Sequence, residues 1–353
     1  MIDISSVYRW NGEDKGFAGW EALKVSQSDQ PDIFVAKGPV SGPNLFLFPG
    51  LCEPWHSFEP IFDDITKRFT VWVQDLRGHG WSDKDPMGRY GVKDYIGDAC
   101  RLVDELMEGE FFVAGHSLGA LIAAGVASQR PEKVRGVLLE DGPFFMTEPD
   151  QWETHPWRNR VFGDLAGRMR IAEAEGLNQE QFVDLYADRL FAFVPDGAPP
   201  QRVRWANKIF AIFADLRDSL DQPLQDKMDN AVLALINQKE ATWGALFPRP
   251  MLEDFAAKYQ HIDWRAPGKA ASIDFSAGFD HQQALRSITC PAAIIEADRD
   301  LSGVLTDGRL DKALSCFGDE TFHVLVDHAM HDVHETHPGE VSAAFERLLE
   351  VSK

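Results

Sequence analysis

The chain has 353 residues, of which 26% are charged, and a formal net charge of −21 at pH 7. This length allows a single core with a large insertion, or two domains. An acidic surface repels nucleic-acid phosphates and anionic lipids, so we expect neither nucleic acid nor membrane as a partner. No apolar run approaches the length of a membrane span. Composition leaves open whether the chain forms a homo-oligomer.

The N-terminus and the cysteines indicate the cellular compartment. The first ten residues, MIDISSVYRW, have neither the basic start nor the apolar centre of a signal peptide, which favours a cytoplasmic protein. The cysteines are far apart and have no CxxC spacing, which is typical of reduced thiols rather than disulfides or zinc ligands. They are Cys52, Cys100, Cys290 and Cys316.

The first part of the chain, residues 1–141, alternates short apolar runs with longer amphipathic ones. Residues 20–37 are more polar and predict an antiparallel hairpin at a sheet edge. From there the alternation predicts parallel strands joined by crossover helices. The strands are expected at 44–48, 70–74, 111–114 and 134–139, with helices at 92–107 and 120–128.

The same pattern returns near the C-terminus, after a long helical interval. Residues 142–285 contain three helical patterns, at 181–194, 203–220 and 227–239, and many Trp and Phe residues. We interpret this interval as a cap domain inserted into the core. Residues 286–353 complete the core with strands at 292–295 and 323–326 and a closing helix at 338–351. The predicted fold class is α/β, a mostly parallel doubly wound sheet with a large helical cap.

Ser117 is the candidate nucleophile. It lies in the run GHSLG at 115–119, directly after the apolar strand 111–114 and directly before an apolar helix. In this context the GxSxG pattern places the serine on a sharp turn from strand to helix, where a side chain in place of either glycine would clash with its neighbours. The start of the helix also favours developing negative charge.

A serine hydroxyl needs a base, and His331 is the best placed of the eleven histidines. It follows the last strand and precedes Pro338, which opens the final helix, so its loop can reach the carboxyl edge of the sheet. His328 is the second choice. The run His328, His331, His334 and His337 could also suggest a metal, but three-residue steps turn successive side chains on a helix by roughly 60°. The first and fourth would face opposite sides, so we predict no metal site.

The oxyanion hole needs backbone N–H groups, so its trace is a tight loop beside the nucleophile. The run FPGLC at 48–52, directly after the strand 44–48, fits this description. We assign the two donors as the amides of Leu51 and Leu118.

Taken together, these motifs resemble the α/β-hydrolase superfamily. The PGL loop, the segment WHSF at 55–58, the run DLRGHGWSD at 75–83, the GHSLG elbow and the late Asp and His loops occur in the order that this family uses. The resemblance covers the chain except the cap, and it implies that residues 75–83 are structural.

The resemblance leaves the acid of the triad open between two places. Most family members carry it after the penultimate strand, where Asp300 lies, although Ala297 stands where glycine is usual. Some members, among them lactonases of the macrolactone zearalenone, carry it after the strand that follows the nucleophile's helix. The segment EDGPFF at 140–145 is similar to theirs, which implies Glu140 or else Asp141. We prefer Asp300 to Glu140, and Glu140 to Asp141.

These residues predict a hydrolase of carboxylic esters or lactones that works without a cofactor. Ser117 would attack the carbonyl, and His331 would move the proton. A serine rather than an aspartate nucleophile disfavours dehalogenase and epoxide hydrolase chemistry. The aromatic cap favours an apolar small-molecule substrate, with zearalenone as one candidate. The alternatives are hydrolysis of a C–C bond by the same triad, and a ligand sensor built on the same fold.

Overall fold

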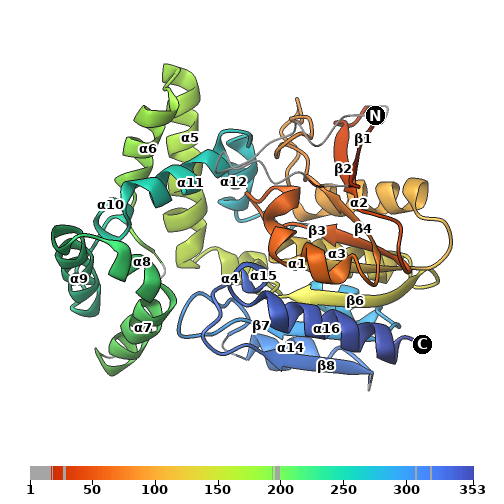
Figure 1. Ribbon diagram of the computed structural model, residues 1–353. Coiled ribbons are helices and arrows are strands. Elements are labelled where there is room, and N and C mark those ends of the chain that lie inside the picture. Colours follow the sequence, from red (N-terminus) through yellow and green to blue (C-terminus); the bar gives the residue numbers. More distant parts are fainter. Residues whose placement is uncertain are drawn as a thin grey trace.

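The structure is a computed structural model that describes residues 17, 19–26, 29–192, 194, 199–306, 308–318 and 320–353. The ten N-terminal residues used above to infer the compartment lie outside this part. Within it, eight strands form one sheet in the order β1-β2-β4-β3-β5-β6-β7-β8 (Figure 1). The hairpin of β1 (Glu21–Val25) and β2 (Ile33–Lys37) is antiparallel and lies at one edge, and β2 also runs antiparallel to β4.

The other strands pair in parallel, in the places that the sequence predicts to within a few residues. They are β3 (Asn44–Phe48), β4 (Thr70–Gln74), β5 (Phe111–His116), β6 (Val134–Glu140), β7 (Ala292–Glu296) and β8 (Thr321–Leu325). The predicted fold class, a mostly parallel doubly wound sheet with a large helical insertion, is confirmed.

Helices cover both faces of this sheet, because the strands carry apolar side chains on both of their faces. On β5, Phe111 and Val113 join one hydrophobic cluster, whereas Phe112 and Ala114 join the other. Helices of the first face are α2 (Val92–Leu106), α3 (Leu118–Gln129), α13 (His281–Arg286) and α14 (Arg309–Leu314). Those of the second face are η2 (Trp55–Phe58), α1 (Glu59–Ile65), α15 (Val333–Thr336) and α16 (Pro338–Val351).

The interval between β6 and β7 is helical and extends away from the sheet, toward the left of Figure 1. It contains α4 (Pro149–Trp152), η3 (Arg158–Gly163), α5 (Asp164–Glu175), α6 (Gln179–Ala187), α7 (Pro199–Ile212), α8 (Ala214–Ser219), α9 (Gln222–Ile236), α10 (Trp243–Leu246), α11 (Arg249–Tyr259) and α12 (Arg265–Ala270). We call residues 142–285 the helical insertion.

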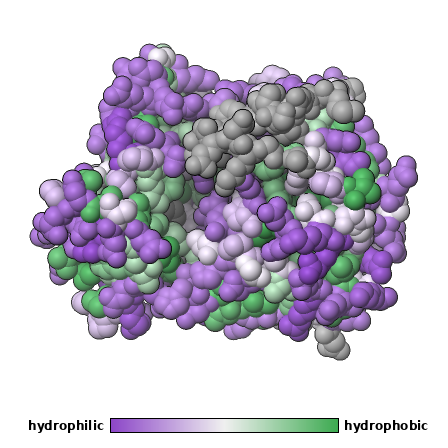
Figure 2. All heavy atoms as spheres, viewed as in Figure 1, coloured by the Kyte–Doolittle hydropathy of each residue, from purple (hydrophilic) through white to green (hydrophobic). Residues whose placement is uncertain are grey.

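The helical insertion has a hydrophobic cluster of its own, formed around Trp205, Tyr186 and Val232. Its two ends instead pack into the first cluster of the sheet, through Trp152 and Ala270 among others. The division into three domain ranges stays a prediction. Figure 2 shows hydrophobic residues gathered along the boundary between the insertion and the sheet. In the part of the chain that the structure describes, no helix combines the length and apolar character needed to cross a bilayer.

Candidate active site

Ser117 lies on the turn between β5 and α3. Its backbone has φ 52° and ψ −118°, a conformation that side-chain-bearing residues rarely adopt. The Ser117 amide donates to the carbonyl of Glu140 on the neighbouring strand, at 2.9 Å. This bond holds the strained turn against the sheet and presents the serine at the carboxyl end of β5.

The two glycines of the GHSLG run are needed because backbone atoms approach them closely. A Cβ at Gly119 would lie 1.8 Å from the carbonyl oxygen of Phe48, and one at Gly115 would lie 2.1 Å from the carbonyl oxygen of Gly119. Both distances are below any real contact between heavy atoms. The turn therefore packs directly against the end of β3, where the predicted oxyanion loop begins.

The oxyanion loop, residues 49–53, is held in place by its own amides. The Gly50 amide donates to Glu53 Oε2 at 2.8 Å, and the Cys52 amide donates to His79 Nε2 at 3.0 Å. Burial lowers the pKa of His79 to about 4, so the ring is neutral and can accept that bond. Residues 75–83 therefore support the loop, as the resemblance implies.

The amides of Leu51 and Leu118 are left for another acceptor. Neither donates a hydrogen bond to any residue that the structure describes. Leu51 lies between the two tethered amides of the loop, and Leu118 is the first residue of α3, where backbone N–H groups have no partner within the helix. Two free N–H groups beside Ser117 are what an oxyanion hole requires.

His331 is fixed at the elbow from three directions. Its amide donates to Ser302 Oγ at 2.8 Å, and its carbonyl accepts from His116 Nε2 at 3.0 Å. Its Nδ1 lies 2.7 Å from Asp141 Oδ2. Because a carboxylate only accepts, Nδ1 carries the proton, and Nε2 is then free to act as a base. The ring of Trp157 meets the imidazole edge to face, with centroids 5.8 Å apart.

Asp141 is the carboxylate behind His331. It is fully buried, and its oxygens also accept from the amides of Val304 and Leu305, at 3.0 and 3.4 Å. Its backbone has a φ of 37°, the left-handed region again. The sequence analysis places Asp141 last among three candidates, and in this respect the preferred order is wrong.

Asp300 and Glu140, the two preferred acids, have other partners. The Asp300 side chain is 38% exposed, and one of its oxygens lies 3.5 Å from Nζ of Lys208 in the helical insertion. Glu140 is fully buried and accepts from both the amide and Nδ1 of His334, each at 2.8 Å. Neither carboxylate makes an ion pair with His331 in the described chain.

The register of the sheet explains why Asp141, and not Glu140, faces His331. His116 and Glu140 are Cα partners on β5 and β6, so their side chains point to the same face, toward α15. The first residue after each strand, Ser117 or Asp141, has a positive φ and turns to the site. Both strands end in a pair, His-Ser and Glu-Asp, and aligning these two pairs in the sequence could have identified Asp141.

Within the described chain, His328 and His334 on either side of His331 have different partners. His328, the second choice for the base, is half exposed and lies 3.5 Å from Asp327 through Nε2. His334 is paired with Glu140 in α15, a short helix that ends before Pro338 opens α16. The predicted absence of a metal shared by this run is not tested by these contacts.

Sequence reasoning missed a buried charged group beneath the elbow. His116 is fully buried, and its Nδ1 lies 2.9 Å from Glu53 Oε1. Burial disfavours the charged form of His116, but the carboxylates of Glu53 and Glu140 outweigh it and hold its pKa well above its usual range. His334 also has a raised pKa, because Glu140 outweighs its burial. The variable position of the GxSxG pattern therefore links the nucleophile turn to the oxyanion loop.

Comparison with known proteins agrees with this geometry. Residues 43–182 match the family model of the alpha/beta hydrolase fold. A 2-(acetamidomethylene)succinate hydrolase of Mesorhizobium japonicum is 38% identical over 109 residues, which are 31% of this chain and 39% of that protein. The chain covers 33 to 59% of the length of the first three curated relatives.

Solved structures extend the likeness to nearly the whole chain. A bacterial membrane phospholipase A superposes with a TM-score of 0.60 at 18% identity, over 95% of this chain and 87% of that one. A carboxylesterase of Bacillus subtilis superposes with a TM-score of 0.58 at 17% identity, over 94% of this chain and 91% of that one. At these identities the structures show a shared fold.

Proposed function

Because this chain belongs to the α/β-hydrolase superfamily, we propose that it is a serine hydrolase that cleaves a carboxylic ester or lactone through an acyl-enzyme. One observation carries the proposal. The strained turn at Ser117 and the pair of His331 with the buried Asp141 meet at one edge of the sheet. This is the set of groups that makes a serine hydroxyl nucleophilic.

In the proposed mechanism, Ser117 Oγ attacks the substrate carbonyl while His331 Nε2 takes its proton. Asp141 keeps Nδ1 protonated and stabilises the imidazolium that forms. The amides of Leu51 and Leu118 stabilise the oxyanion. His331 then protonates the leaving alkoxide, and it activates the water that releases the acid from Ser117.

The surroundings of the base support an apolar substrate. Trp157 lies against the His331 ring, and Met330 packs on the hydrophobic cluster of the helical insertion. Leu51 packs on that cluster and also on the first cluster of the sheet. An acyl or alcohol group that enters beside Ser117 therefore meets aromatic and aliphatic side chains, which favours a ring-containing ester or lactone over a small polar one.

The resorcylic macrolactone zearalenone is the specific candidate substrate. The relative in Mesorhizobium japonicum is named for a succinate derivative, which is anionic. Incubation with each compound, followed by chromatography, separates the two possibilities. Ring opening of zearalenone supports the proposed substrate. A closed ring together with conversion of the succinate derivative would reject it and leave the serine mechanism in place.

Steady-state turnover of p-nitrophenyl butyrate tests the serine mechanism. Wild type should turn over many equivalents, and Ser117→Ala should lose at least about 10³-fold in kcat, since the residual rate of triad variants comes from binding and the oxyanion hole. Ser315→Ala is the matched control, because that hydroxyl bonds only the Lys312 carbonyl on an exposed helix end. Unchanged activity in Ser117→Ala would overturn the mechanism. Stoichiometric binding without turnover by wild type would indicate a ligand sensor.

A further inference from the structure

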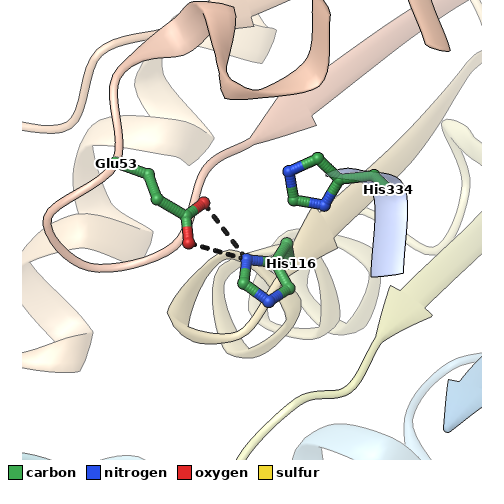
Figure 3. A group of neighbouring side chains, drawn as sticks. All are labelled: Glu53, His116 and His334. Atoms are coloured by element: carbon green, nitrogen blue, oxygen red, sulfur yellow. Dashed lines mark hydrogen bonds and ion pairs between the residues drawn. The ribbon is translucent and has the colours of Figure 1, made fainter. Parts of the chain in front are cut away.

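Three side chains converge at the end of β5, directly before the nucleophile turn (Figure 3). Glu53 comes from the oxyanion loop, His116 from the end of β5, and His334 from α15. One ligand atom of each lies within 4.8 Å of the others. Both imidazoles are fully buried, and the carboxylate is 14% exposed.

The outer nitrogen of each imidazole is already bonded to an acceptor. His116 Nε2 donates to the carbonyl of His331 at 3.0 Å, and His334 Nδ1 donates to Glu140 Oε1 at 2.8 Å. These two bonds require N–H on the outer nitrogens, so a neutral ring presents a lone pair on the inner one. His334 Nε2 has no hydrogen-bond partner among the described residues, although it is buried.

Metal-binding histidines have this arrangement. Their second nitrogen donates to a carboxylate or a backbone carbonyl, which fixes the tautomer and aims the first nitrogen at the ion. The Glu53 carboxylate is supported in the same way, since Oε2 accepts the Gly50 amide at 2.8 Å. All three side chains are thus oriented by a second layer of contacts.

The carboxylates around the group also favour positive charge there. Glu140 is fully buried, Glu53 is nearly so, and Asp332 Oδ1 lies 3.6 Å from His116 Nε2. If both imidazoles are neutral, the negative charges of these three carboxylates are not offset by the two rings. Lys258 is the nearby cation, but it is shared with Glu335, at 3.5 Å. Two positive charges would offset two of these three carboxylates, and they can be two protons on the imidazoles or one divalent ion.

We propose that Glu53, His116 Nδ1 and His334 Nε2 bind one divalent transition-metal ion of the Zn²⁺ type, with water as a fourth ligand. Two imidazoles and a carboxylate suit Zn²⁺ and Co²⁺ better than Ca²⁺ or Mg²⁺. Tetrahedral ligands lie about 3.3 Å apart. His116 Nδ1 and Glu53 Oε1 lie 2.9 Å apart, somewhat closer than this spacing, and the ligand atom of His334, on the four-residue helix α15, lies within 4.8 Å of both.

The proposed ion has a structural role. It joins the oxyanion loop, the strand before Ser117 and the short helix α15 after His331, so it would fix their relative positions without touching the substrate. It differs from the metal site considered in the histidine run, because of that run only His334 contributes. It is also independent of the proposed function, since binding can be measured without substrate.

Calorimetric titration of the chelator-treated full-length chain with Zn²⁺ tests the proposal. Wild type should bind one ion per chain, and His334→Gln should weaken that binding at least 100-fold, since even the loss of a supporting contact costs 10- to 100-fold. His323→Gln is the control, because His323, on the edge strand β8, pairs with Glu296 at the end of β7 and its loss should leave binding unchanged. Zn²⁺ should raise the melting temperature of wild type and of His323→Gln but not of His334→Gln.

A second variant and a spectroscopic probe distinguish the loss of a metal ligand from misfolding of a single variant. Glu53→Gln should weaken binding as His334→Gln does, and Co²⁺ absorption bands near 600 nm should report tetrahedral coordination in the wild type. Equal binding by wild type, His334→Gln and Glu53→Gln, or no stoichiometric binding by folded wild type, would overturn the proposal. The two imidazoles would then carry protons. Ser117→Ala should bind the ion like wild type, which separates this outcome from a failure of the hydrolase mechanism.

Discussion

Replacing Asp141 by asparagine removes one charge from the proposed triad and changes little else. Asp141 Oδ2 accepts from His331 Nδ1 at 2.7 Å and from the Val304 amide at 3.0 Å. An asparagine oxygen at the same place keeps both bonds. Its NH₂ group then faces the Leu305 amide, whose present bond of 3.4 Å is long and weak. The variant therefore tests the carboxylate charge rather than the position of the ring.

The size of the effect follows from the charge separation. When His331 becomes an imidazolium, its charge lies about 4 Å from that of Asp141, and at an effective dielectric constant of about 20 the attraction is about 4 kcal/mol. Losing it from the transition state lowers kcat by roughly 10³-fold, at 1.36 kcal/mol per factor of ten. We expect this loss in kcat, with KM little changed, for p-nitrophenyl butyrate.

The matched control is Asp300→Asn, the same substitution at the acid that the sequence favours. Asp300 is 38% exposed and pairs with Lys208, so its kcat should stay within about threefold of wild type. Circular dichroism would verify that both variants are folded. If Asp141→Asn keeps more than a tenth of the wild-type kcat while Asp300→Asn falls by orders of magnitude, the assignment of the acid is refuted.

Three further predictions concern stability. Gly119→Ala places a methyl group 1.8 Å from the last carbonyl of β3 and should lower the free energy of unfolding in urea by at least about 3 kcal/mol. Gly167→Ala, inside α5 with nothing within 4 Å of the new atom, should raise it by about 0.5–1 kcal/mol, and a similar loss in both variants would contradict the packing argument. Burial lowers the pKa of His281 to about 3, so the unfolded state binds this proton first as the pH falls below 6.5. The free energy of unfolding should therefore decrease as the pH is lowered from 6.5 to 3, and His281 should contribute about 1.4 kcal/mol per pH unit to that decrease. In His281→Gln, the number of protons taken up on unfolding in this range should be smaller by one. Lys208→Met leaves the buried carboxylate of Asp298 without its cation. We expect the free energy of unfolding in urea to fall by about 2 kcal/mol, and the double variant with Asp298→Asn should recover part of that loss.

Much of the fold could be predicted because its signals are local. The apolar runs that form β3, β4 and β5 are bounded by polar or glycine-rich turns, and the closing helix begins at Pro338 as predicted. Helix boundaries in the insertion are less exact, since the pattern at 203–220 is divided into α7 and α8 near Phe213. A hydrophobic period fixes the type of an element better than its ends.

The candidate site likewise contains residues with a local sequence signal and residues without one. Ser117 and the oxyanion loop carry short sequence patterns, because backbone geometry there demands glycine at fixed positions. Asp141 lies in the EDGPFF segment, but that pattern does not distinguish it from Glu140. Its partner is 190 residues away, and the choice between it and Glu140 depends on which face of β6 each one takes. The buried pair of His116 and Glu53 is hidden for the same reason, since 63 residues separate the two.

Mass spectrometry of the acyl-enzyme tests the central claim most directly. The chain is mixed with p-nitrophenyl butyrate, quenched in acid during turnover and digested, and the peptide that contains residues 115–119 is analysed. We expect a butyryl group on Ser117 in the wild type. His331→Ala should carry no more than a trace of it, and Ser117→Ala should carry none. Full turnover with no acyl group on this peptide, or a butyryl group on another residue that is lost on hydrolysis, would contradict it.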